Sequence, residues 1–115
     1  MEPTQKSDQE KSSLVKTELD SGFNMIEFHG YTSYEDFMLI YDKIKQIIEP
    51  DEMSYSVDSL CIMGSIRKDG ILMRMSNEGI SEYVSIFYNK NTVVDVDRDK
   101  IENWAEQINR ALCKI

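Results

Sequence analysis

The spacing of apolar residues changes twice along this chain, and the change constrains the fold more than any other feature. Between residues 34 and 48, apolar side chains recur at every third or fourth position, as on one face of an amphipathic helix. From Tyr55 onward they recur at every second position, which is typical of a strand with one buried face. The helical spacing returns at Ile101. This order predicts a single α+β domain.

Local signals predict where the first helix begins and ends. Thr32 and Glu35 have the capping-box spacing, in which a hydroxyl accepts a free amide at the helix start and a carboxylate bonds back to the chain. Pro50 is expected to end the helix, because the residue before a proline is disfavoured in helical conformation. The last helix is expected to begin near Asp97 or Asp99, either of which is a suitable N-cap.

Four to five antiparallel strands are expected between and before these helices. The segment Phe23–His29 alternates between two faces and ends at Gly30. A long strand starts at Tyr55 and ends at a tight turn over residues 68–70, where Asp and Gly tolerate positive φ. The other expected strands are Ile71–Ser76, Ile80–Tyr88 and, as an optional fifth, Thr92–Val96. The predicted order is β-α-β-β-β-(β)-α, with both helices packed on one face of the sheet.

The first 21 residues differ in character from the rest of the chain. They contain few aliphatic residues, so we expect a flexible polar tail over residues 1–21 and a single domain over residues 22–115. The tail has no apolar stretch like that of a secretory signal, which favours a cytoplasmic protein. Cys61 and Cys113 are too far apart to suggest a disulfide framework, and each is expected to be a small buried side chain. The alternative is a single disulfide between them.

The face of the sheet opposite the helices is expected to be open and partly apolar. If Ile62 and Ile66 point toward the helices, the alternate positions of the strands point away from them. Apolar patches with polar rims often mark protein interaction sites. The alternative is that this face is covered or merely half-buried. The residues predicted for an apolar binding surface are Tyr55, Val57, Met63, Tyr83 and Phe87.

The charge of the chain points to the kind of partner. The sequence has 21 Asp and Glu against 13 Lys and Arg, a net charge of -8, which disfavours nucleic acid and favours a basic protein. Two groups of acids are expected to form two lobes of a surface that faces cations, although each could also be an ordinary solvated loop. The groups are Glu49, Asp51, Glu52 and Asp58, and Asp95, Asp97 and Asp99.

The sequence predicts no catalytic residue, metal or cofactor. Asp95, Asp97 and Asp99 have the spacing of a calcium loop with Glu106 at its twelfth position, but Lys100 occupies the place where glycine is needed. His29 is the only histidine, and no nucleophile with suitable spacing accompanies it.

The order of elements from Ser33 to Cys113 resembles the α-β-β-β-α order of the signal recognition particle Alu-binding proteins. Those proteins bind RNA through basic residues, whereas residues 22–115 hold 16 acids against 10 bases. Small acidic α+β chains of this type are also similar to toxin-immunity proteins and type III secretion chaperones.

We therefore expect a non-enzymatic protein, monomeric or homodimeric, that binds no membrane and occludes a basic partner as an inhibitor or immunity-type protein. The alternatives are a secretion or assembly chaperone that uses the apolar sheet face, and a small-ligand-binding domain or enzyme.

Overall fold

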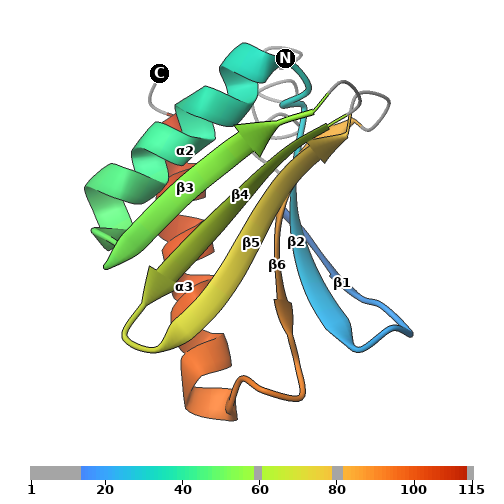
Figure 1. Ribbon diagram of the computed structural model, residues 1–115, viewed down its shortest axis with the longest axis vertical. Coiled ribbons are helices and arrows are strands. Elements are labelled where there is room, and N and C mark those ends of the chain that lie inside the picture. Colours follow the sequence, from blue (N-terminus) through green and yellow to red (C-terminus); the bar gives the residue numbers. More distant parts are fainter. Residues whose placement is uncertain (1–13, 59–60, 79–81, 114–115) are drawn as a thin grey trace, which may run out of the picture.

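The computed structural model describes residues 14–58, 61–78 and 82–113. The described chain forms one six-stranded antiparallel sheet with two helices on one of its faces (Figure 1). This architecture confirms the predicted α+β class. The elements in chain order are β1 (Leu14–Glu18), β2 (Phe23–His29), α2 (Tyr34–Ile48), β3 (Glu52–Val57), β4 (Cys61–Lys68), β5 (Ile71–Glu78), β6 (Tyr83–Asn89) and α3 (Asp95–Cys113).

The strands lie in the order β1-β2-β6-β5-β4-β3, so β1 and β3 are the two edges of the sheet. The helices α2 and α3 run in opposite directions on the same face (Figure 1). The core lies between them and the sheet, and its fully buried side chains include Phe28, Phe37, Ile40, Ile44, Ile66, Ile101 and Ile108. Among the described helices, none has an apolar stretch long enough to cross a bilayer.

The helix α2 begins as the sequence predicts, but its capping box is shifted by one residue. Ser33 is the N-cap, and its hydroxyl accepts a hydrogen bond from the Asp36 amide at 3.1 Å. The Asp36 carboxylate accepts in return from the Ser33 amide at 3.2 Å. The box therefore uses Ser33 and Asp36 in place of Thr32 and Glu35. At the other end, Glu49 adopts φ 54 and turns the chain out of the helix before Pro50.

The expected tail is wrong for residues 14–18, which form the edge strand β1. This strand pairs with β2 from Leu14 opposite Phe28 to Glu18 opposite Asn24. Leu14 packs against the core, and Lys16 lies 3.5 Å from the Glu102 carboxylate of α3. Backbone hydrogen bonds to β2 and the contact of Leu14 with the core hold β1 in place. The low apolar content of this segment therefore did not exclude a strand. Residues 1–13 of the expected tail lie outside the described residues.

Two further strand predictions are corrected. The long strand expected from Tyr55 is a hairpin of β3 and β4, which the Asp58 amide closes by donating to the Cys61 carbonyl at 2.8 Å. The optional strand Thr92–Val96 is absent from this described segment: the amide of Thr92 bonds to the Asn89 carbonyl in a turn, and α3 begins at Asp95. Ser59, Leu60 and Ile80, which the predicted strands included, lie outside the described residues.

Candidate protein-binding surfaces

Most of the predicted acidic residues lie at one end of the molecule. By the strand register, β3 begins and β6 ends at the same end of the sheet, so the α2–β3 connection and the segment that leads into α3 are both attached there. In Figure 1 this connection lies at the left and the start of α3 lies at the bottom. Because α2 and α3 are antiparallel, the end of one helix and the beginning of the other share this end. We call this region the acidic end. Its residues are Glu49, Asp51, Glu52, Asp95, Asp97 and Asp99.

The acids of the α2–β3 connection also stabilise its shape. The Asp51 carboxylate accepts a hydrogen bond from the Asp69 amide at 2.9 Å and so holds the β4–β5 turn. The Lys68 ammonium donates to the Glu49 carbonyl at 3.0 Å. Glu52 is 3.6 Å from Arg67, but both side chains are more than half exposed, so this pair adds little stability. The carboxylate of Glu52 therefore stays accessible to a partner.

The acids of α3 lie on its first turns. Asp95 is 2.6 Å from Arg98 and its side chain is 90% exposed, while Asp97 is 4.0 Å from Lys100. Acids at a helix N-terminus interact favourably with the helix dipole. The helix dipole thus accounts for acids at this position. Among the described residues, no group of three or more His, Cys, Asp or Glu is arranged to hold a metal ion.

Asp58 is separated from the other predicted acids. It follows the last residue of β3, whereas Glu52 begins that strand, so the two lie at opposite ends of it (Figure 1). The first predicted lobe is therefore split by the length of β3.

No described helix covers the face of the sheet opposite α2 and α3, and this face carries a band of half-buried apolar side chains. The register pairs Met25 with Phe87 and His29 with Tyr83, at positions that alternate with the buried Ile26 and Phe28. The rings of Phe23 and Phe87 meet edge to face with centroids 5.9 Å apart. Met63 lies on the same face, because it alternates with the buried Ile62 and Ile66. We call this set the uncovered band: Phe23, Met25, Met63, Tyr83 and Phe87.

The structure also shows where Cys61, Cys113 and His29 lie. Cys61 is half-buried on this face of the sheet and Cys113 is exposed at the end of α3, so the expectation that both are buried is wrong, and both are free. The His29 Nε2 lies 2.7 Å from a Glu27 carboxylate oxygen. This pair lies on the face of the sheet opposite the helices, outside the pocket described below.

Tyr55 and Val57 do not belong to the uncovered band, contrary to the prediction. Tyr55 is opposite Gly64 and Val57 is opposite Ile62, and paired residues in an antiparallel ladder point to the same face. Ile62 is buried under the helices, so both side chains point to the helix side. They remain 40% and 61% exposed because β3 is an edge strand.

At this edge, Tyr55 joins an aromatic cluster with residues of α2. Its ring centroid is 5.0 Å from that of Tyr41 and 6.2 Å from that of Phe37. A hydrogen bond with Tyr55 raises the pKa of Tyr34, which places the two phenol groups together. Burial raises the pKa of Tyr41. We call Tyr34, Tyr41, Tyr55 and Val57 the edge cluster.

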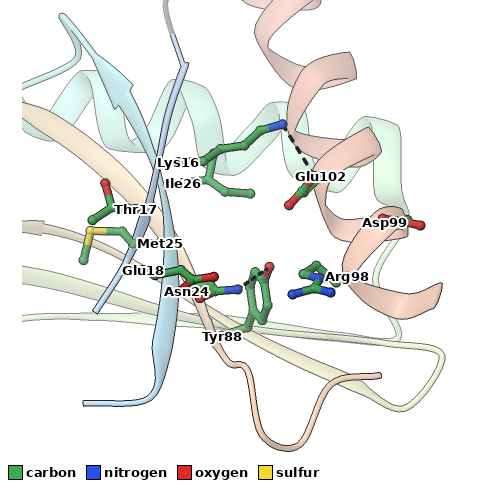
Figure 2. A pocket seen from close by; sticks show the side chains of 10 residues that line it. All are labelled: Lys16, Thr17, Glu18, Asn24, Met25, Ile26, Tyr88, Arg98, Asp99 and Glu102. Carbon is green, nitrogen blue, oxygen red and sulfur yellow. Dashed lines mark hydrogen bonds and ion pairs between the residues drawn. The ribbon is translucent and has the colours of Figure 1, made fainter. Parts of the chain in front are cut away.

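A pocket of about 370 Å³ lies between the β1–β2 edge and the first half of α3 (Figure 2). The Asn24 side-chain amide donates to the Tyr88 hydroxyl at 3.2 Å, and the buried Asn24 Oδ1 has no partner among the described residues. Burial raises the pKa of Tyr88, although the bond from Asn24 opposes this. On the wall, Lys16 faces Glu102 in an ion pair. The pocket is thus polar, and other ion pairs of its lining residues, Arg98 with Asp95 and Glu18 with Lys90, lead to residues outside it.

The sequence indicated some of these features and missed others. Alternation in β2 already placed Phe23 and Met25 on one face, but only the strand order brings them beside Phe87. The pocket could not be anticipated, because one of its walls is the unexpected strand β1. Comparisons of the chain with protein-family models, with curated proteins and with solved structures found no match.

Proposed function

We propose that this protein is a non-enzymatic binding module for a protein with a basic surface, acting as an inhibitor or immunity-type protein that occludes its partner. The observation that carries the proposal is the distribution of charge. Residues 34–58 contain seven acids and two lysines, and six of those acids are exposed. Exposed acids steer a basic partner toward the surface and penalise acidic competitors.

The uncovered band supports the same proposal by supplying apolar contact area. Methionine and aromatic side chains are common in protein interfaces, since they offer large contact surfaces at low cost in entropy. A partner with a basic rim around an apolar centre would complement both the band and the charge of the chain. The proposed location is the cytoplasm, where two free cysteines would remain reduced.

Affinity capture from a lysate of the native host, at low and at high salt, tests this function. The captured protein should have a basic surface, and its purified form should bind about tenfold more weakly when the ionic strength is raised from about 50 to about 500 mM, because salt screens exposed charges. An affinity that does not change with salt would contradict the electrostatic part of the proposal.

The second candidate function is a secretion or assembly chaperone, and the uncovered band is the observation that favours it. A chaperone would hold an apolar segment on Phe23, Met25 and Phe87. Its binding would weaken strongly in a Phe87→Ser variant and would respond little to salt. The basic-partner function predicts a strong response to salt.

A further inference from the structure

The outer edge of β3 is available for pairing with another strand. In the sheet order β3 is the last strand, so among the described residues no strand pairs with its outer side. The bond from the Asp58 amide to Cys61 marks a hydrogen-bonded position of the β3–β4 ladder. Such positions alternate in an antiparallel ladder, so the amides of Val57 and Tyr55 are expected to point outward.

The two edges of the sheet differ in how they are protected. Natural edge strands commonly carry lysine or proline, which discourages pairing with other chains. The strand β1 has Lys16, which pairs with Glu102 and Glu106 of α3. The strand β3, with the sequence Glu-Met-Ser-Tyr-Ser-Val, has neither residue type. Its edge lacks the usual protection.

The side chains beside this edge form a binding surface with a definite chemistry. An added strand would place alternate side chains on the helix side, over Tyr55, Val57 and the exposed Tyr34. The Lys45 ammonium already lies 6.0 Å from the ring centroid of Tyr41, so a tyrosine of this cluster accepts a cation. Apolar and cationic side chains both suit the edge cluster.

Two kinds of strand could pair with this edge: β3 of a second copy of this chain, or an extended segment of another protein. The charge of the chain favours the second. A second copy of this chain would bring two bodies of charge -8 together, and their acid-rich 34–58 segments would repel each other. A basic segment would instead be attracted to the exposed acids of this region: Glu52 begins β3, and Glu35 and Asp42 follow Tyr34 and Tyr41 of the edge cluster in the chain.

We infer that β3 binds an extended, basic segment of the partner protein, which adds to the sheet as a seventh strand beside the edge cluster. Main-chain hydrogen bonds give affinity in this mode, and the alternate side chains give specificity. The inference rests on the proposed binding of a basic protein, and it specifies which surface and which kind of segment are used.

The test uses a synthetic heptapeptide of alternating lysine and valine, with the ends blocked, added to the full-length protein at low salt. Amide hydrogen exchange is followed by NMR. We expect the amides of Tyr55 and Val57 to exchange about tenfold more slowly when the peptide is bound. The same peptide with its central valine replaced by proline should bind weakly, as should a heptapeptide of alternating glutamate and valine.

A pair of variants at the exposed Val57 separates the contribution of the backbone amide to peptide binding from that of the side chain. Val57→Pro removes the outward amide, and proline is tolerated on an edge strand. Val57→Ala removes most of the side chain and keeps that amide. We expect Val57→Pro to weaken peptide binding at least about tenfold and Val57→Ala at most about threefold. If Val57→Pro does not fold, the exchange measurement on the natural chain still decides.

Several outcomes would overturn the inference. Slow exchange of the Tyr55 and Val57 amides in the free monomer would show that the chain covers its own edge. Protection that rises with protein concentration, together with a dimer by sedimentation, would assign the edge to a second copy. Peptide-induced shifts confined to the uncovered band, or no peptide binding, would also contradict it. Salt-dependent capture of a basic partner requires no particular surface, so the proposed function would survive these results.

Discussion

The ring of Tyr55 in β3 meets the ring of Tyr41 in α2 at an interplanar angle of 72°, with centroids 5.0 Å apart. This contact joins the edge strand to the helix that lies over it. Tyr41 is only 6% exposed, whereas Tyr55 is 40% exposed. The pair therefore anchors the edge strand to the helix, while the ladder with β4 keeps the backbone of β3 extended.

This contact is expected to contribute measurably to stability. Tyr41→Ala should lower the free energy of unfolding by about 3 kcal/mol, and Tyr55→Ala by about 1 kcal/mol, because only Tyr41 is buried. A double-mutant cycle by urea unfolding should give a coupling of about 1 kcal/mol, as for other edge-to-face pairs. Additive effects within about 0.3 kcal/mol would show that the two rings do not stabilise each other.

Gly64 in β4 is expected to be intolerant of a side chain. A Cβ at this position would lie 2.7 Å from the Cγ of Met75 and 3.5 Å from the Ser54 carbonyl oxygen. Met75 is completely buried, so Gly64→Ala should overpack the core and lower the free energy of unfolding by about 1–3 kcal/mol.

The matched test is the same substitution in a Met75→Ala background. Met75→Ala removes the Cγ that causes the clash, so Gly64→Ala should have a clearly smaller effect there than in the natural chain. An equal effect in both backgrounds would mean that Met75 is not the cause of the intolerance.

The stability of the fold should fall in alkaline solution. Burial raises the pKa of Tyr31, Tyr41 and Tyr88 above the ordinary value of 10.0. These three buried, neutral phenol groups contribute their full stabilisation at any pH below the pKa that they have in the unfolded chain. As the pH rises from about 10 through the folded pKa, the unfolded chain releases protons that the folded chain retains, so stability is lost.

Tyr88 should account for part of this loss. Urea unfolding between about pH 8 and 11 should give a shallower fall for Tyr88→Phe than for the natural chain, since one titrating group is removed. At neutral pH the variant should be less stable by about 1–2 kcal/mol, because the Asn24 amide loses its acceptor. An identical pH slope in both proteins would contradict a role for Tyr88.

The sequence predicts the helices and the buried faces well, because both depend on periodicity. Ile62 and Ile66 are buried as their spacing indicates. The misplacement of Tyr55 has a geometric cause. In one continuous strand, odd-numbered residues share a face, but in the β3–β4 hairpin odd-numbered Tyr55 lies opposite even-numbered Gly64. The turn therefore moves Tyr55 to the other face.

The acidic end could be predicted only in part. Composition identified the acids, but their grouping depends on the antiparallel directions of α2 and α3, which bring the end of one helix and the start of the other to the same side. The position of Asp58 depends on the turn after β3. Periodicity reports which residues are buried, and it does not report where chain segments meet.

The most direct measurement compares two charge-neutralised variants in binding to the purified basic partner by calorimetry. One variant carries Glu52→Gln and Asp95→Asn at the acidic end. The control removes two exposed acids elsewhere, with Glu82→Gln and Glu106→Gln. We predict that the first variant binds about tenfold or more weakly and the control within about threefold of the natural chain. Equal losses in both variants, or no loss in either, would contradict a binding surface at the acidic end.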